Sequence, residues 1–152
     1  MRLEDSFTVR APAARVWQAL MDPAAIAGCL PGVEGIEVLG PTSYKAAVRV
    51  ELGPIKTVFH VQVEIRDQEP PCRLAAVTRG EEGTRASMLS ADSTLELEEL
   101  ADGATAVRYS SEVSVVGRLG KFGLGVMRKK AEALGRAFAE NFRARVEQAA
   151  AA

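Results

Sequence analysis

The spacing of apolar residues changes once along this chain, and the change restricts the fold more than any other feature. Between residues 44 and 116 apolar and polar residues alternate, and after Arg118 apolar residues recur at every third or fourth position. Alternation places apolar side chains on one face of a strand, whereas the longer spacing places them in one stripe along a helix. The sequence therefore predicts half-buried antiparallel strands followed by one long amphipathic helix.

Proline and glycine mark the boundaries of the remaining elements. In the first part of the chain we expect one strand and two short helices, over residues 3–10, 12–21 and 23–30. Alternating segments separated by turn residues, including a turn at 80–83, are expected as strands over residues 44–52, 55–66, 72–79, 84–100 and 104–116. The predicted order is a strand, two short helices, about six strands and a long helix.

This order predicts a single α+β domain over residues 1–152. A curved antiparallel sheet of about seven strands needs cover for its apolar face, and the terminal helix is long and apolar enough to provide it. The sheet is expected to wrap around that helix, while the two short helices close one end of the space between the layers. The alanine-rich tail, about residues 147–152, is expected to fray.

Facing sets of apolar residues define what lies between sheet and helix. Such sets fill the core in many proteins, and an apolar ligand cavity is the alternative. In a cavity, Tyr44 and Tyr109 could offer hydroxyl groups to a polar headgroup. The candidate cavity residues are Tyr44, Val48, Phe59, Val61, Leu95, Leu97, Tyr109, Phe122, Val126, Met127, Leu134 and Phe138. The polar stretch 90–94 is expected to form a bulge, or a polar spot inside the cavity.

Glycine and basic residues cluster where the last strand meets the long helix. Four glycines, Gly117, Gly120, Gly123 and Gly125, indicate either close packing of helix on sheet or a loosened first turn that acts as a gate. The net charge is −1, yet the segment from Arg118 onward holds eight Lys or Arg and three Glu residues. The basic residues of its first half are Arg118, Lys121, Arg128, Lys129 and Lys130. They either solvate the helix or meet an anionic membrane or an acidic partner.

The composition of the chain offers little for catalysis, metal binding or nucleic-acid binding. Its one histidine, His60, is expected to point outward, and Cys29 and Cys72 are too few and too far apart for a metal site. Paired nucleophile and base motifs are missing from the sequence, so we expect no catalytic residue, no metal and no cofactor. The near-neutral charge argues against nucleic acid. Short apolar runs and a polar N-terminus predict a cytoplasmic protein.

Residues spread over positions 3–146 are similar to those of a known family. They are Val16-Trp17, Leu20, Asp22-Pro23, Ala27-Gly28-Cys29-Leu30-Pro31-Gly32, Tyr44, Pro70-Pro71, Gly103, Tyr109 and Val115-Val116-Gly117-Arg118-Leu119-Gly120. On these residues the chain resembles the carbon monoxide dehydrogenase CoxG family of the START and polyketide-cyclase (SRPBCC) superfamily. The resemblance implies a helix-grip fold around a hydrophobic cavity. Some members carry a further C-terminal tail associated with membrane attachment.

The resemblance also implies a function, which the residues alone do not specify. It implies a non-enzymatic protein that binds a lipid or quinone and is accessory to an aerobic, molybdenum-containing CO dehydrogenase or a related hydroxylase. Such a protein would aid membrane recruitment or quinone coupling, as a peripheral protein at the inner face of the membrane. Two alternatives remain open: a polyketide cyclase or dehydratase-like enzyme acting in the same cavity, and a protein-binding module that uses the basic helix.

Overall fold

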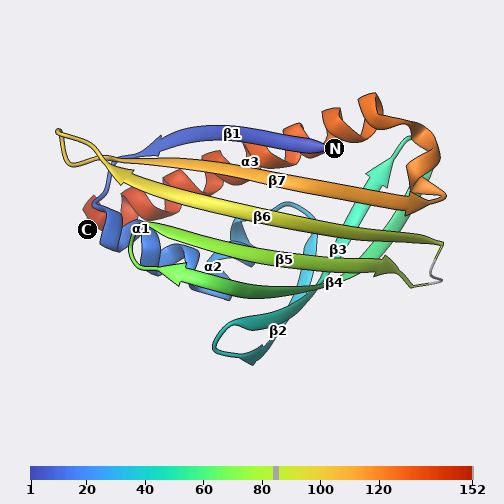
Figure 1. Cartoon of the computed structure of the whole chain (residues 1–152), viewed down its shortest axis with the longest axis horizontal. Helices are drawn as coiled ribbons and strands as arrows, with labels where there is room; N and C mark the ends of the chain where they lie inside the picture. Colours follow the sequence, from blue (N-terminus) through green and yellow to red (C-terminus); the bar gives the residue numbers. More distant parts are fainter. Residues whose placement is uncertain (84–85, 152) are drawn as a thin grey trace.

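The computed structural model describes residues 1–83 and 86–151, and over these the chain forms a sheet layer and a helix layer. The sheet has seven antiparallel strands in the order β1-β7-β6-β5-β4-β3-β2, and the long helix α3 crosses its inner face (Figure 1). The strands are β1 (Arg2–Val9), β2 (Val33–Gly40), β3 (Ser43–Leu52), β4 (Ile55–Glu69), β5 (Arg73–Glu82), β6 (Ser87–Glu99) and β7 (Thr105–Gly117). This is the predicted curved sheet with a covering terminal helix.

The helices follow the predicted order, with one interruption. Two short helices, α1 (Ala13–Leu20) and α2 (Pro23–Cys29), come directly after β1, and the Asp22 side chain accepts a hydrogen bond from the Ala24 N–H at the start of α2. The sequence predicted one terminal helix from Arg118. The structure has a 3-10 turn, η1 (Leu119–Phe122), then Gly123 with φ of 88°, then α3 (Leu124–Ala151). The helical phase of the apolar stripe therefore restarts at residue 124. The alanine tail is helical to Ala151, and Ala152 lies outside the described residues.

Two strands differ from their predicted bounds. β2 was not singled out by the sequence pattern, because it is an edge strand whose Val38 is 61% exposed. β5 continues through Glu82, where a turn was expected at 80–83. A Cβ at Gly80 would lie 2.7 Å from Val61 Cγ1, so glycine here permits close strand contact and does not mark a turn. The predicted start of the next strand, residues 84 and 85, lies outside the described residues.

The registers of β6 with β5 and β7 are uninterrupted, so the polar stretch 90–94 forms no bulge. Ser93 pairs with Ser111 across β6 and β7, and their hydroxyl oxygens lie 2.8 Å apart. This pair shares a face with Leu95 and Tyr109, two residues farther along each strand, so it faces the helix. Of the two expectations for this stretch, the polar spot on the inner face is the one observed.

The buried residues form two clusters at opposite ends of α3. The α1–α2 cluster consists of Val9, Ala11, Val16, Trp17, Leu20, Cys29, Leu97, Val107, Phe142 and Val146. The η1 cluster consists of Leu52, Phe59 and Leu119, with Val50, Ile55, Val61, Leu89, Val115, Phe122 and Met127 packed against them. Between these clusters the inner face of the sheet is only half-buried. Among the described residues, no helix is long and apolar enough to cross a bilayer.

Candidate ligand pocket

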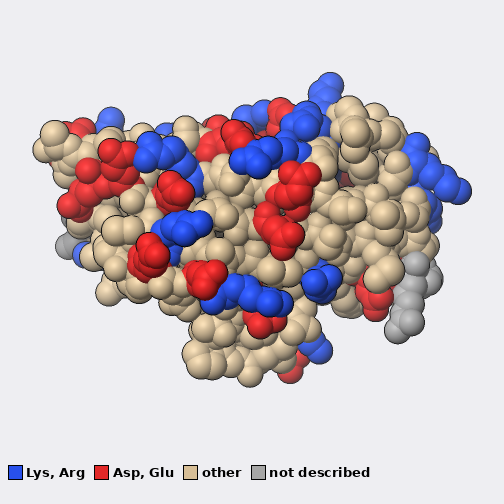
Figure 2. Space-filling model, viewed as in Figure 1, with Lys and Arg blue, Asp and Glu red and all other residues tan. Residues whose placement is uncertain are grey.

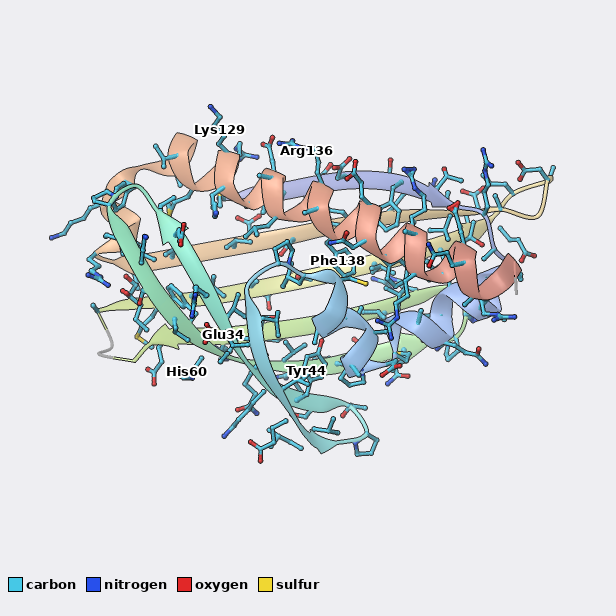
Figure 3. All side chains as sticks on the ribbon, turned by 180° about the vertical axis from the view of Figure 1, so that it is seen from behind. Glu34, Tyr44, His60, Lys129, Arg136 and Phe138 are labelled. Atoms are coloured by element: carbon cyan, nitrogen blue, oxygen red, sulfur yellow. The ribbon has the colours of Figure 1, made fainter. Side chains whose placement is uncertain are left out.

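An apolar pocket of about 330 Å³ lies between the middle of α3 and the inner face of β1, β7 and β6. The apolar residues around it are Leu3, Phe7, Leu30, Leu74, Leu95, Ala131, Leu134 and Phe138. Figure 3 places Phe138 beneath α3, toward the sheet, and Lys129 and Arg136 on the opposite side of the helix. The pocket is at the lower end of the volumes typical of small-molecule sites and has their apolar lining.

A larger hollow, of about 620 Å³, lies elsewhere on the protein, on the outer face of the sheet. Its walls include Lys45, His60 and Arg79, which point away from the helix. Figure 2 shows acidic and basic side chains intermixed over this face. An apolar ligand would stay in contact with charged groups and water there, so the smaller pocket between the layers is the better apolar site.

The structure divides the candidate cavity residues among three places. Leu95, Tyr109, Leu134 and Phe138 line the pocket. The remaining core residues are distributed between the clusters: Phe59, Val61, Phe122 and Met127 in the η1 cluster, and Leu97 in the α1–α2 cluster.

The other three candidates lie away from the pocket. Tyr44 and Val48 are half-buried on β3, where burial raises the pKa of the Tyr44 hydroxyl. Val126 is 46% exposed, so its place in the apolar stripe is a correction to the sequence analysis. The cause is Gly123, which ends η1 with a positive φ and turns the start of α3, so that Val126 faces outward.

Tyr109 projects from β7 across the pocket to a glycine of the helix. A Cβ built at Gly135 would lie 2.7 Å from the Tyr109 hydroxyl oxygen and 3.9 Å from its Cζ. The hydroxyl therefore occupies the space that any other side chain at position 135 would take. Burial, followed by the charges of Asp5 and Glu132, raises the pKa of this hydroxyl, which stays protonated at neutral pH.

The edge of the pocket beside Tyr109 carries charged residues. Asp5 and Glu132 line it, as do Glu4 and Arg128. Arg2 pairs with Glu4, and the Arg128 guanidinium donates a hydrogen bond of 2.8 Å to the Arg2 carbonyl oxygen. The polar edge is therefore made by β1 and α3 together, at the point where the edge strand meets the helix.

Two of the four gate glycines are explained by packing. A Cβ at Gly117, where φ is 94°, would lie 2.1 Å from the Ala86 carbonyl oxygen, and one at Gly120 would lie 2.8 Å from the Val115 carbonyl oxygen. Gly123 and Gly125 differ, because a Cβ at either would have no described atom within 4 Å. Packing thus accounts for the first pair, and the open space around the second pair leaves room for movement.

A buried ion pair fixes the segment between these glycines. Glu82 is 1% exposed, and its carboxylate accepts two hydrogen bonds of 3.1 Å from Arg118 Nε. Hydrogen bonds from Arg118, Ser87 and Thr57 lower the pKa of Glu82 to about 2, against the opposing effect of burial. Ser87 Oγ also accepts a hydrogen bond of 3.0 Å from the Leu119 N–H, so the network joins η1 to β4, β5 and β6.

The five basic residues proposed for membrane or partner contact are not equivalent. Arg118 is bound to Glu82, and Arg128 to the Arg2 carbonyl. Lys121 and Lys129 are exposed, whereas Lys130 is half-buried. Lys and Arg side chains project from the end of the molecule where η1 and α3 begin (Figure 2). Leu124 and Val126, which are 64% and 46% exposed, lie on the same turns of α3.

Residues with other chemistry lie away from the pocket. His60 is exposed on the outer face of β4, as its strand parity predicted. Cys29 is buried and Cys72 is exposed, and both are free thiols. Among the residues that the structure describes, no three His, Cys, Asp or Glu side chains are grouped as metal ligands.

Sequence analysis missed Leu3, Phe7, Leu30 and Leu74 as lining residues, because they come from strand and helix ends that alternation does not connect. It also missed Gly135, although an isolated glycine inside a long helical stripe was a usable signal. Such a glycine costs about 1 kcal/mol relative to alanine, so it needs a packing reason.

Comparison with solved structures identifies the fold. The chain is similar to a conserved protein from Geobacillus kaustophilus, with a TM-score of 0.90 and 22% identity over 97% of this chain and 96% of that one. A START superfamily protein from Mycobacterium smegmatis gives 0.74 and 17%, over 97% of each chain. The Zhui aromatase/cyclase from Streptomyces sp. R1128 gives 0.70 and 17%, over 97% and 94%. These likenesses show a START-like helix-grip fold.

Comparison at the sequence level identifies the family. None of the curated proteins matches the sequence. The family model for the carbon monoxide dehydrogenase protein CoxG matches residues 6–147, nearly the whole chain. Family and fold together support a protein of the START and polyketide-cyclase superfamily that binds a hydrophobic ligand. The chain belongs to the carbon monoxide dehydrogenase CoxG family.

Proposed function

We propose that this protein is a non-catalytic carrier of a lipid or quinone, accessory to an aerobic molybdenum-containing CO dehydrogenase or a related hydroxylase. The observation that carries the proposal is the apolar pocket of about 330 Å³ under α3 in a chain of this family. Its walls offer apolar contact, one tyrosine hydroxyl and the Ser93–Ser111 pair at the edge of the inner face. Such a lining binds an apolar molecule without chemically activating it.

The catalytic alternative is an enzyme of the cyclase type in the same pocket. General acid–base catalysis needs a group whose pKa lies near the working pH and whose proton reaches the substrate. The one histidine, His60, lies on the outer face of the sheet, remote from the pocket. We therefore expect His60→Ala to leave ligand binding unchanged. Turnover of an aromatic polyketide or ester that is lost on mutation of Tyr109 would establish the enzyme instead.

Ligand binding is tested by filling the pocket. Ala131 lines it, and Ala133 is exposed on the same helix. Fluorescence titration with N-phenyl-1-naphthylamine should show saturable binding to the wild type, binding at least tenfold weaker to Ala131→Phe, and unchanged binding to the matched control Ala133→Phe. Mass spectrometry of solvent extracts of the purified protein should identify the natural ligand. Equal titrations for both variants would place the probe outside the pocket and contradict the proposal.

The proposed docking surface consists of Lys121, Leu124, Val126 and Lys129, at the start of α3. Exposed apolar residues beside basic ones suit the interface of an anionic bilayer, where each basic residue contributes about 1 kcal/mol. It adjoins Gly123 and Gly125, the pair we propose as the gate. Arg118 and Arg128 contribute less, because each is already hydrogen-bonded within the protein.

Liposome co-sedimentation tests this surface and separates membrane from partner. The wild type should bind vesicles containing anionic lipid at low salt, and high salt should release it, because ions screen such contacts within about 10 Å. Lys121→Glu/Lys129→Glu should abolish binding. Arg10→Glu/Arg15→Glu, an equal charge change on exposed residues near α1, is the control. Binding that is negligible under all conditions would leave an acidic face of the partner hydroxylase as the contact, to be tested by co-purification with that enzyme.

A further inference from the structure

The pocket contains one polar contact whose geometry is tightly specified. Tyr109 reaches from the sheet to the helix, and its hydroxyl oxygen fills the space beside Gly135 where a Cβ would lie 2.7 Å away. Glycine in a helix interior costs about 1 kcal/mol relative to alanine. The helix therefore carries a destabilising residue at the one position that lets the Tyr109 hydroxyl stand against it, at the edge of an otherwise apolar pocket.

The charge around that hydroxyl is acidic. Asp5 and Glu132 raise the pKa of Tyr109 through their charges, and both line the pocket, as does Glu4. Arg128, the basic residue of this lining, directs its guanidinium to the Arg2 carbonyl oxygen at 2.8 Å. A carboxylate or phosphate placed beside Tyr109 would meet two like charges and no uncommitted cation among the lining residues that the structure describes. An uncharged carbonyl would meet a protonated hydroxyl donor.

We infer that the pocket selects compact, uncharged amphiphiles that carry a hydrogen-bond-accepting oxygen, and rejects anionic lipids such as fatty acids. In this arrangement Tyr109 donates its hydroxyl proton to the ligand oxygen, Gly135 makes room for that hydroxyl, and Asp5 and Glu132 exclude anions. The inference rests on the proposed function, because it specifies the ligand class of the same pocket.

Two ligands with ten carbons and different heads test the selection. Displacement of N-phenyl-1-naphthylamine at pH 7.5 compares 2-decanone, which is neutral, with decanoate, which is ionised. The wild type should bind 2-decanone at least tenfold more tightly than decanoate. Equal or tighter binding of decanoate would overturn the inference while leaving the carrier function intact. A wild type that binds neither the probe nor the ketone would overturn the proposed function as well.

The chain supplies a matched control for the hydroxyl, because its two tyrosines are Tyr44 and Tyr109. Tyr109→Phe removes the donor and keeps the ring, so it should weaken 2-decanone binding about threefold to tenfold, the range expected for one neutral hydrogen bond, and change probe binding less than twofold. Tyr44→Phe on β3, which is not among the lining residues, should change neither. Unchanged ketone binding in Tyr109→Phe would remove Tyr109 from the recognition step.

Gly135 is tested by a rescue experiment. Gly135→Ala should displace the Tyr109 ring into the pocket and weaken probe binding at least fivefold. The Tyr109 Cζ is 3.9 Å from the Cβ position, an ordinary contact, so Tyr109→Phe/Gly135→Ala should restore probe binding while ketone preference stays lost. A double variant that still fails to bind the probe, although folded by circular dichroism, would show that Gly135 serves the helix and not Tyr109.

The acidic pair is tested by charge removal. Asp5→Asn/Glu132→Gln should tighten decanoate binding about threefold to tenfold and leave 2-decanone binding unchanged, and high salt should reduce the difference between wild type and variant. Glu140→Gln, an exposed residue of the same helix, is the control. Decanoate binding that does not respond to removal of both carboxylates would contradict the anion-exclusion part of the inference.

Discussion

The two ends of α3 are held to the sheet in different ways. At the C-terminal end Phe142 is fully buried and Val146 is 3% exposed, both within the α1–α2 cluster. At the N-terminal end Leu124 and Val126 are 64% and 46% exposed, and attachment depends on the η1 cluster and on one ion pair. Extensive apolar burial gives a fixed attachment, whereas few buried contacts give low local stability. The pocket lies between the two, so we expect it to open at the N-terminal end.

The C-terminal attachment should show the largest effect. Phe142 stacks on Phe138 with ring centroids 5.4 Å apart and meets Phe7 edge to face at 6.3 Å. Phe142→Ala should lower the free energy of unfolding by about 3–5 kcal/mol, because it leaves a cavity in the α1–α2 cluster. Val126→Ala should change it by less than about 0.5 kcal/mol. Urea unfolding measures both, and equal losses would mean that the two ends are equally anchored.

The ion pair at the N-terminal end should rank second. Glu82 is buried, so Arg118→Ala would leave an unpaired carboxylate and lower the free energy of unfolding by roughly 2–3 kcal/mol at pH 7. The Arg108–Glu98 pair, whose side chains are 53% and 55% exposed, is the control, and Arg108→Ala should cost less than about 1 kcal/mol. A cost for Arg118→Ala no greater than that of the control would show that the pair does not hold η1.

The same pair predicts a pH dependence. The pKa of Glu82 is lowered from 4.5 to about 2 in the folded protein, so between these values the unfolded chain binds more protons. The stabilisation is complete above pH 4.5 and is lost as the pH falls toward 2. The difference in stability between wild type and Arg118→Ala should therefore be constant from pH 7 to about 5 and shrink below that. A difference that instead grows on acidification would contradict the assigned role.

Gly117 is the next step down in expected effect. Its φ of 94° and the Ala86 carbonyl oxygen 2.1 Å from its Cβ position make any side chain strained. Gly117→Ala should lower the free energy of unfolding by roughly 2–3 kcal/mol. Gly35→Ala, where a Cβ would have no described atom within 4 Å, is the control and should be near neutral. Thermal unfolding ranks the two, and a neutral Gly117→Ala would mean that η1 is not packed as described.

The sequence predicted those parts of the fold whose causes are local. The hairpin of β3 and β4 follows from alternation on both sides of Gly53-Pro54, and Leu52 pairs with Ile55 as that turn requires. The long helix follows from its apolar stripe. The two short helices follow from proline and aspartate at their starts. In each case the residues that determine the structure are neighbours in the chain.

The sequence did not predict features that depend on distant residues. Glu82 belongs to a buried strand end because Arg118, 36 residues later, neutralises it. Gly135 is needed because Tyr109 lies opposite, 26 residues earlier in the sequence. Val126 left the predicted stripe because a positive φ at Gly123 changes the helical phase. Spacing along the chain carries none of this information, so the candidate pocket was predicted in outline and half of its lining was missed.

Gly125 carries the smallest expected effect and distinguishes packing from gating at the N-terminal end. It lies in the first turn of α3, and a Cβ there would have no described atom within 4 Å. Gly125→Ala should therefore raise the free energy of unfolding by up to about 1 kcal/mol, because alanine favours helix. If that turn must loosen before a ligand enters, the same change should slow probe uptake in stopped-flow fluorescence by up to about fivefold.

The contrast with the fixed end makes this test specific. Ala144→Gly, an exposed position near the buried end of α3, changes helix propensity in the opposite direction and should lower stability by up to about 1 kcal/mol without changing the uptake rate. Slower uptake in Gly125→Ala together with normal uptake in Ala144→Gly would locate the gate at the start of the helix. A stabilised Gly125→Ala with normal uptake would instead mean that the turn is open space and not a gate, and that ligand enters from the β1 side of the pocket.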